Sequence, residues 1–252
     1  MGSVSRETVV AALQAALEPL PFVDALVEGG AAAWGRLDPW SDVDLYAFVE
    51  DGKTEEAFHA IEGALQTLSP IQHTFAAQWP PASGIHQKFY RLEAAGPFLL
   101  VDLAVVTRSA PEKFLEPEIH GDNVVYFDKT GITRIPPLDR DAFHRKLRER
   151  LAHLQDGTEM FHAFVEKELN RGNGIEAFDN YRTYVLGPLL EVLRMKHGSL
   201  HHSFRARYVH SELPADVVAR YRMLLFVSGP DDLRSKYPEA LRWFREVARD
   251  LR

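Results

Sequence analysis

A glycine-containing turn followed by two closely spaced aspartates constrains this chain more than any other stretch. Residues 29–46 read GGAAAWGRLDPWSDVDLY, and the apolar run 45–49 is typical of a buried strand. Side chains two residues apart on an extended strand point to the same side, so Asp42 and Asp44 are expected to face one way. Two carboxylates held this close repel each other unless a cation joins them. The stretch therefore predicts a strand that begins with a cation site.

Metal and phosphate binding is the chemistry expected of these residues. Hard oxygen ligands suit Mg²⁺, which keeps several waters and is usually held together with the phosphates of a substrate. Gly29 and Gly30 lack a Cβ, so the backbone amides of their turn can approach a phosphate closely. An alternative interpretation is a glycine-rich hairpin with an aspartate pair on its surface.

The same residues resemble the signature of the polymerase-beta-like nucleotidyltransferase superfamily. That signature is a glycine-serine turn, a spacer, and an acid-x-acid pair on a strand. The residues that carry the resemblance are Gly29, Gly30, Gly35, Ser41, Asp42, Asp44 and Leu45. Two positions depart from the pattern, because Ala31 stands where the family has serine and Trp34 stands where many members have arginine.

This resemblance implies a set of functional residues in the first half of the chain. Asp42 and Asp44 would hold one or two Mg²⁺ ions, and the co-substrate would be ATP or another nucleoside triphosphate. The residues expected to contact the nucleotide there are Gly29, Gly30, Ala31 and Ser41.

A third acidic residue lies inside the most apolar strand-like segment. Asp102 interrupts the run 98–106, and burying a lone carboxylate is costly unless it is paired or binds a metal. Such a residue is often hydrogen-bonded in a core. The resemblance, however, places a third carboxylate on a neighbouring strand, which implies that Asp102 completes the metal site and acts as general base. Glu93, at the end of the preceding strand, is the competing candidate for the base.

The hydrophobic periodicity predicts an α+β fold in two parts. In the first part, an N-terminal sheet with flanking helices is expected, and the resemblance implies that it is a mixed sheet of the nucleotidyltransferase type. Its helices are predicted over 5–20, with Ser5 as the N-cap, and over 53–68. Its strands are predicted over 23–28, 45–49, 71–77, 86–93, 98–106 and 124–127, and those over 86–93 and 98–106 are expected to pair as a hairpin or as neighbours. Pro136 and Pro137 mark the boundary. Beyond it, a C-terminal helical bundle is expected from helices over 140–154, 158–171, 176–197, 214–227 and 239–251.

The helical half resembles the C-terminal domain of small-molecule nucleotidyltransferases that inactivate antibiotics. Its layout is closest to the lincosamide and aminoglycoside adenylyltransferases. The resemblance implies a catalytic domain over 1–137 and a substrate-binding domain over 138–252.

The two halves differ in charge. Residues 1–139 contain 9 basic and 20 acidic residues, whereas residues 140–252 contain 20 basic and 16 acidic residues. Arginine suits bidentate phosphate contacts, so one or two residues of a basic cluster are expected to reach the triphosphate. The cluster consists of Arg194, Lys196, Arg205 and Arg207. The alternative interpretation of this cluster is a solvated basic face. His197 and His201 are four residues apart, which would suit a zinc site on a helix, although Gly198 interrupts that helix.

Composition excludes several classes of protein. The chain has no cysteine, so disulfides, thiolate nucleophiles and cysteine-based zinc sites are excluded and a cytoplasmic location is favoured. An apolar run of membrane-spanning length is absent from the sequence. The net negative charge of the chain argues against binding a long nucleic acid, because proteins that do so usually carry a basic stripe.

These observations together predict Mg²⁺-dependent transfer of a nucleoside monophosphate, AMP from ATP, to a hydroxyl of a small molecule such as an antibiotic. Three alternatives remain open. One is a nucleotide-binding protein with weakened catalysis, suggested by Ala31 and Trp34. The others are an adenylyltransferase that modifies a protein partner and a template-independent RNA nucleotidyltransferase.

Overall fold

The chain forms two units, which are joined between Pro137 and Leu138. A computed structural model describes residues 4–251. The N-terminal unit, Met1–Pro137, contains a mixed β-sheet with helices, and the C-terminal unit, Leu138–Arg252, contains helices. The α+β class predicted from the sequence is therefore confirmed.

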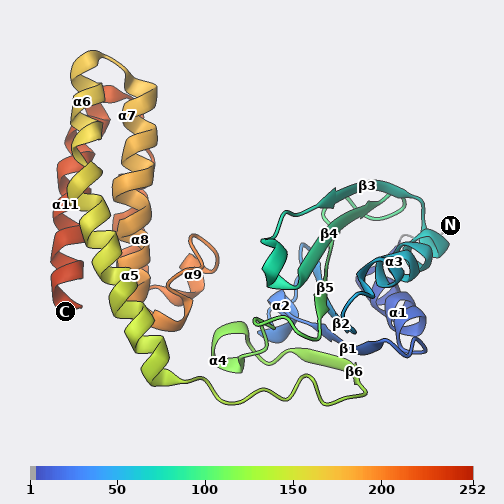
Figure 1. Ribbon diagram of the computed structural model, residues 1–252. Coiled ribbons are helices and arrows are strands. Elements are labelled where there is room, and N and C mark those ends of the chain that lie inside the picture. Colours follow the sequence, from blue (N-terminus) through green and yellow to red (C-terminus); the bar gives the residue numbers. More distant parts are fainter. Residues whose placement is uncertain (1–3, 252) are drawn as a thin grey trace. The chain divides into compact units, whose positions relative to one another are not determined.

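A six-stranded sheet forms the centre of the N-terminal unit (Figure 1). Its strand order is β3-β4-β5-β2-β1-β6, and neighbours are antiparallel except for β2 and β5, which run parallel. A parallel pair brings the same ends of two strands together, and this pairing later positions the site. The strands are β1 (Val23–Glu28), β2 (Val43–Val49), β3 (Ile71–Ala76), β4 (Ile85–Leu92), β5 (Val101–Thr107) and β6 (Val124–Asp128).

Two helices, α1 (Arg6–Leu17) and α3 (Thr54–Leu68), cover one face of this sheet (Figure 1). Ser5 caps α1, because its side chain accepts a hydrogen bond from the Thr8 backbone N–H and the Thr8 side chain accepts one from the Ser5 backbone N–H. Along β2, Val43 and Leu45 belong to the core under these helices. Since side chains alternate along a strand, Asp44 faces the other side of the sheet.

The opposite face carries a smaller core and three short helical turns. Phe48 of β2 and Val106 of β5 are buried in this core together with Leu115. The short elements are α2 (Gly30–Ala33), the 3₁₀ turn Pro81–Ser83 and α4 (Pro117–His120). Asp44 thus lies on the face that the long helices leave uncovered.

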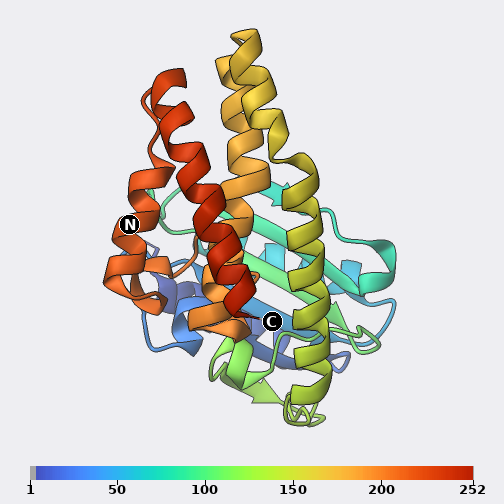
Figure 2. The ribbon, with the colours of Figure 1, turned by 90° about the vertical axis from the view of Figure 1, so that its left-hand side faces the viewer.

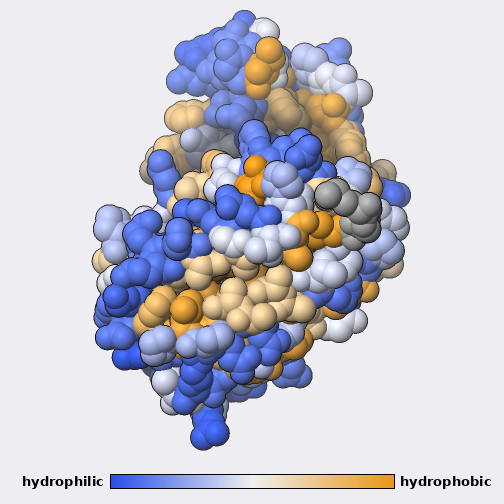
Figure 3. All heavy atoms as spheres, turned by 90° about the vertical axis from the view of Figure 1, so that its right-hand side faces the viewer, coloured by the Kyte–Doolittle hydropathy of each residue, from blue (hydrophilic) through white to orange (hydrophobic). Residues whose placement is uncertain are grey.

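Strand β3 is one edge of the sheet, and its side chains are largely exposed. Phe75 is 64% exposed and contacts Phe89 of β4, with ring centroids 6.1 Å apart. Figure 3 shows hydrophilic side chains interspersed with hydrophobic ones on the face that it draws. A short edge strand with mixed side chains limits edge-to-edge pairing with other chains.

Helices of very different length make up the C-terminal unit. The long C-terminal helix α11 runs beside the rod formed by α7 and α8 (Figure 2). The helices are α5 (Arg140–Phe161), α6 (Ala163–Arg171), α7 (Gly174–Tyr181), the π-helical turn Arg182–Leu186, α8 (Gly187–His197), α9 (Val209–Glu212), α10 (Ala215–Leu225) and α11 (Pro230–Asp250). Within residues 4–251, no helix combines the length and apolar character needed to cross a bilayer.

Several predicted boundaries were wrong. Helix α5 continues through Gly157 to Phe161, and α11 begins at Pro230 although Pro238 lies inside it. An interior glycine costs about 1 kcal/mol and an interior proline about 3 kcal/mol, which buried side chains can outweigh. In α11 the buried residues include Leu233, Tyr237, Leu241 and Phe244. Strand β5 begins at Val101 instead of residue 98, because Phe98 lies in a turn and is 61% exposed.

A π-helical turn at Arg182–Leu186 interrupts the long rod of α7 and α8. Pro188 lacks a backbone N–H, and in a regular α-helix its ring would clash with the carbonyl of Tyr184. The wider π turn provides room for that ring. Gly187 sits in the tight part of the turn, where a Cβ would lie 3.2 Å from the Arg182 carbonyl oxygen.

Candidate active site

The parallel pairing of β2 and β5 brings two predicted carboxylates together. Asp44 lies opposite Asp102 in the register of the two strands. Neighbouring strands are about 4.8 Å apart, so paired residues leave the same face of the sheet side by side. Two acidic residues that are distant in the sequence thus form one acidic centre, which we call the carboxylate pair.

The predicted glycine turn lies directly on Asp44, one member of this carboxylate pair. The Gly29 backbone N–H donates to the Asp44 carbonyl oxygen at 2.9 Å. Gly30 adopts φ +55°, and a Cβ on it would lie 1.8 Å from Asp44 Oδ2. A side chain at Gly30 would therefore displace the carboxylate, so the turn and Asp44 can pack this closely only because residue 30 is glycine.

Asp42 lies one residue before β2, beside the chain that enters β5. The Val43 backbone N–H donates to the Leu100 carbonyl oxygen at 2.9 Å, which holds these two segments together. Burial raises the pKa of Asp42 above its ordinary value, although a backbone hydrogen bond from Leu100 and the charge of Arg91 act in the opposite direction. A carboxylate that loses hydration in this way is stabilised in its charged form by a nearby cation.

The three predicted metal ligands do not form a ready-made cluster. Among residues 4–251, no group of three or more histidine, aspartate or glutamate side chains is arranged to hold a metal ion. The three-carboxylate site expected from the sequence therefore stays a prediction. The carboxylate pair still offers donors suited to Mg²⁺, which is commonly bound through one or two carboxylates plus substrate phosphates.

Glu93, the competing candidate for the general base, lies away from the carboxylate pair. Phe89 of β4 is opposite Asp102, and Glu93 follows it by four residues in an exposed turn. At about 3.3 Å per residue, this places Glu93 roughly 13 Å along the strand from the register of Asp102. Asp102 is therefore the better candidate for the base.

Ser41 and Trp34 shape the segment between the glycine turn and β2. The Ser41 hydroxyl donates to Asp38 Oδ1 at 2.9 Å and accepts from the Asp38 backbone N–H at 2.9 Å. Trp34 packs against Gly121, where a Cβ would lie 3.0 Å from the indole, and the Arg36 guanidinium lies 5.5 Å from the Trp34 ring. Ala31 belongs to α2 next to the turn.

Arg194 has a structural place inside the C-terminal unit, which differs from its predicted role in nucleotide binding. It is only 1% exposed, and its guanidinium donates to the carbonyl oxygens of three residues of the following loop and to Glu212 Oε2 at 2.8 Å. The three carbonyls belong to His201, Arg205 and Arg207. This buried guanidinium, whose hydrogen bonds go to the loop and to Glu212, holds the loop in place.

The other members of the predicted basic cluster have exposed side chains. Lys196 pairs with Asp250 at 2.9 Å, and the Arg207 guanidinium lies 5.7 Å from the Phe204 ring. Arg205 is exposed and adopts φ +54°. These three residues remain candidates for phosphate contacts.

The zinc alternative gains no support. The Nδ1 atom of His201 lies 3.1 Å from Glu212 Oε1, whereas His197 is exposed at the end of α8. Neither histidine belongs to a group of three or more possible ligands among residues 4–251.

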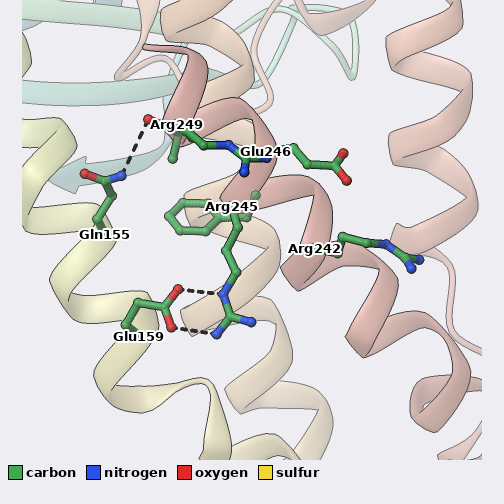
Figure 4. A pocket seen from close by; sticks show the side chains of 8 residues that line it. Gln155, Glu159, Arg242, Arg245, Glu246 and Arg249 are labelled. Carbon is green, nitrogen blue, oxygen red and sulfur yellow. Dashed lines mark hydrogen bonds and ion pairs between the residues drawn. The ribbon is translucent and has the colours of Figure 1, made fainter. Parts of the chain in front are cut away.

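The pockets formed by residues 4–251 include two within the C-terminal unit. One, of about 570 Å³, is lined by α5 and α11, and Arg245 makes a bidentate ion pair with Glu159 across it, at 2.6 Å for each bond (Figure 4). The second, of about 390 Å³, is lined by residues 195–201 and includes Lys196 and His197. None of the residues that line the first pocket was predicted from the sequence to be part of a functional site.

An ion pair between α5 and α8 leads to a pH-dependent prediction. Burial alone would raise the pKa of Glu191, but hydrogen bonds from Arg150 and His202 lower it to about 2 from an ordinary value of 4.5. A depressed folded pKa contributes stability above pH 4.5, which is lost as the pH falls toward 2. We expect Arg150→Gln to move the acid-unfolding midpoint, followed by circular dichroism, to higher pH.

The matched control for this prediction is Arg182→Gln. Arg182 pairs with Asp179 at 2.9 Å in the same unit, but both side chains are more than 60% exposed. Exposed pairs contribute little, so its acid transition should match that of the unmodified protein. Equal transitions for all three proteins would contradict the stabilising role of the Arg150–Glu191 pair.

Two functional candidates, Gln87 and Trp79, could not be identified from the sequence. Gln87 contacts Asp102 directly, and Trp79 contacts Gln87. Gln87 Nε2 donates to Asp102 Oδ1 at 2.6 Å, and Trp79 Nε1 donates to Gln87 Oε1 at 3.0 Å. The expected pairing of the strands over 86–93 and 98–106 indicated that some side chain of the first strand would lie beside Asp102. Without the register, however, it could not show which β4 side chain reaches Asp102.

Comparisons with known proteins give structural likeness at low sequence identity. No protein-family model matches the chain, and no curated protein matches it by sequence. Solved structures do match. The chain is similar to nucleotidyltransferases.

Three of these structures indicate the range of the likeness. An aminoglycoside 6-adenyltransferase from Bacillus subtilis has TM-score 0.38 and 15% identity, over 98% of this chain and 90% of that chain. A spectinomycin adenyltransferase from Enterococcus faecialis, with ATP and spectinomycin, has TM-score 0.40 and 11% identity, over 97% of each chain. A STING-associated c-di-GMP synthase from Capnocytophaga granulosa has TM-score 0.30 and 12% identity, over 99% of this chain and 83% of that chain. Because these scores are low, the assignment of function rests on the site itself.

Proposed function

We propose that this protein transfers a nucleoside monophosphate, AMP from ATP, to a hydroxyl of a small molecule. The observation that supports the proposal is the carboxylate pair with the glycine turn packed on it. Asp44 and Asp102 are in register on parallel strands, and Gly30 leaves no room for a Cβ beside Asp44. Carboxylates and an approachable backbone turn are the elements needed to hold a metal-bound triphosphate.

The roles of the residues follow from this geometry. Asp42, Asp44 and Asp102 are the residues that would hold Mg²⁺. The Gly29 N–H already donates to the Asp44 carbonyl oxygen, so other backbone N–H groups of the turn would contact the phosphates. Bound there, Mg²⁺ supplies neutralising charge for the triphosphate and for the departing pyrophosphate.

The proposed reaction is a single in-line displacement. Asp102 accepts the proton of the acceptor hydroxyl, whose oxygen forms a bond to the α-phosphorus. The bond from that phosphorus to the bridging oxygen breaks, and pyrophosphate leaves with the electron pair. We assign the transfer chemistry to the N-terminal unit and acceptor binding to the C-terminal unit. A hydroxyl-bearing antibiotic is the first acceptor to screen, on the basis of the sequence resemblance.

The experiment that tests this proposal is calorimetric titration of a non-hydrolysable ATP analogue, with and without Mg²⁺. We expect the unmodified protein to bind only with Mg²⁺, and the double variant Asp42→Asn/Asp44→Asn to lose about 100-fold in affinity. Losing charged partners of this kind costs roughly 2–5 kcal/mol. The matched control is Asp122→Asn, which removes an exposed carboxylate of the same unit. The proposal would be contradicted if no nucleotide bound, or if the double variant bound it with the same affinity as the unmodified protein.

A nucleotide-binding protein with weakened catalysis is the second candidate. It is favoured by Ala31, which stands beside the turn where the resembled family has serine. Such a protein would bind the ATP analogue with Mg²⁺ but release no pyrophosphate from ATP with any acceptor. Pyrophosphate release that depends on an added acceptor would exclude this second candidate.

A further inference from the structure

A chain of two hydrogen bonds connects the surface of the N-terminal unit to the carboxylate pair. Trp79 Nε1 donates to Gln87 Oε1 at 3.0 Å, and Gln87 Nε2 donates to Asp102 Oδ1 at 2.6 Å. We call this arrangement the Trp79–Gln87–Asp102 chain. Trp79 lies in the loop after β3, Gln87 lies on β4 and Asp102 lies on β5, so the chain connects this loop to two neighbouring strands.

The chemistry of the two end groups dictates how the central amide is oriented. An indole N–H can only donate, whereas an ionised carboxylate can only accept. The Gln87 amide must therefore turn its oxygen to Trp79 and its NH₂ to Asp102. Without the indole, the amide could rotate, and its oxygen could face the carboxylate and repel it.

The backbone around Trp79 holds the indole in place. The Ala77 backbone N–H donates to the Gln87 carbonyl oxygen at 2.9 Å, so the segment leaving β3 stays attached to β4. Pro80 follows Trp79 and restricts its backbone to extended conformations. The Trp79 ring also contacts Phe114, with centroids 6.1 Å apart. Trp79 is 39% exposed, yet the two strands and Phe114 fix its position.

Gln87 supplies a donor without a positive charge. Asp44 is the charged residue opposite Asp102 on β2, and the residue opposite it on β4 is the neutral Phe89. The nearest lysine along β4, Lys88, instead pairs with Glu62 of α3 at 2.9 Å, on the helix-covered side of the sheet. A lysine or arginine in the place of Gln87 would compete with a bound metal ion, whereas an amide orients the carboxylate and preserves its charge.

We propose that Gln87, oriented by Trp79, is a positioning residue that holds the Asp102 carboxylate ready for the metal-bound triphosphate. This inference rests on the function proposed above, and it adds two residues to the site. It predicts that both act through Asp102 and neither touches the reacting atoms.

The first test measures binding of Mn²⁺ with a non-hydrolysable ATP analogue, with Mn²⁺ counted by electron paramagnetic resonance. We expect Gln87→Leu to weaken binding about 10-fold, since partners of metal ligands are typically worth 10–100-fold in affinity. Trp79→Phe keeps an aromatic ring at this position but removes the indole N–H, so it should weaken binding by a smaller factor. The matched controls Gln78→Leu and Trp40→Phe change exposed residues of the same unit and should bind like the unmodified protein.

A double-substitution cycle separates positioning from a general structural effect. If Gln87 acts through Asp102, then Gln87→Leu should cause no further loss in an Asp102→Asn background. The same fold-loss in both backgrounds, or unchanged binding by Gln87→Leu, would overturn the proposal. If Gln87→Leu does not fold, Trp79→Phe in the two backgrounds gives the same comparison.

A ligand-free measurement keeps this inference distinct from the proposed function. The indole N–H signal of Trp79 in a proton–nitrogen correlation spectrum, assigned with Trp79→Phe, should shift in Gln87→Leu and stay unchanged in Gln78→Leu. If the unmodified protein binds no Mn²⁺ and nucleotide, the proposed function fails and the positioning role fails with it, whatever the indole signal does. An indole signal that ignores Gln87→Leu would overturn the hydrogen-bond chain itself.

Discussion

The substitution Gly30→Ala is expected to weaken nucleotide binding strongly while the protein remains folded. Gly30 has φ +55°, and an added Cβ would lie 1.8 Å from Asp44 Oδ2 and 2.6 Å from Asp44 Cγ. The atoms in the way belong to a side chain, so the methyl group would push the carboxylate out of its position. The expected loss is about 100-fold or more in affinity for the ATP analogue with Mg²⁺, comparable to removal of the charge of Asp44.

Gly35 provides a matched control for this prediction. Its φ of +61° imposes nearly the same backbone strain on alanine, but nothing lies within 4 Å of the position of its Cβ. Both variants should lose about 1–2 kcal/mol of unfolding free energy, because alanine is strained in the left-handed region. Only Gly30→Ala should lose nucleotide affinity in calorimetric titration. Equal affinities for the two alanine variants would show that the turn does not support the carboxylate pair.

Features set by neighbouring residues could be predicted from the sequence. Strand β1 has the bounds expected for it, and Ser5 caps α1 as its position before an apolar periodic run indicates. The antiparallel pairing of β4 with β5 also matches the expected hairpin or neighbour arrangement. These features depend on alternation, capping and turn chemistry, which act over a few residues.

The geometry of the candidate site depends on contacts between distant residues. Which acidic residue faces Asp44 follows from the parallel register of β2 and β5, and a shift of one residue would place Asp102 on the other face. The burial of Arg194 depends on a loop that folds back over it, whereas sequence alone shows only a basic residue near the end of a helix. The sequence thus indicates which residue types the candidate site contains, but it does not show which partners the register and the loops bring to them.

The second large effect is expected from Arg194→Met, which should destabilise the C-terminal unit by about 3–5 kcal/mol. The substitution keeps an unbranched apolar stem but leaves Glu212 without the guanidinium that donates to it at 2.8 Å. The carbonyl oxygens of His201, Arg205 and Arg207 also lose their donor. Breaking a buried ion pair by removing one partner typically costs this much, because the remaining charge loses that partner. After Arg194→Met, Glu212 would keep its contact with His201, whose Nδ1 lies 3.1 Å from Glu212 Oε1. Urea unfolding followed by far-ultraviolet circular dichroism measures the change in unfolding free energy.

Two further variants decide whether Arg194 acts through its planar geometry or only through its charge. Arg194→Lys preserves the charge but cannot donate in the several fixed directions of a guanidinium, so it should recover only part of the loss. Lys196→Met removes a cation two residues away, whose pair with Asp250 is 40% and 57% exposed, and its effect should stay below about 1 kcal/mol. A loss for Arg194→Met as small as that for Lys196→Met would mean that the buried guanidinium does not hold the loop. The phosphate-binding role predicted from the sequence would then again be the better explanation for Arg194.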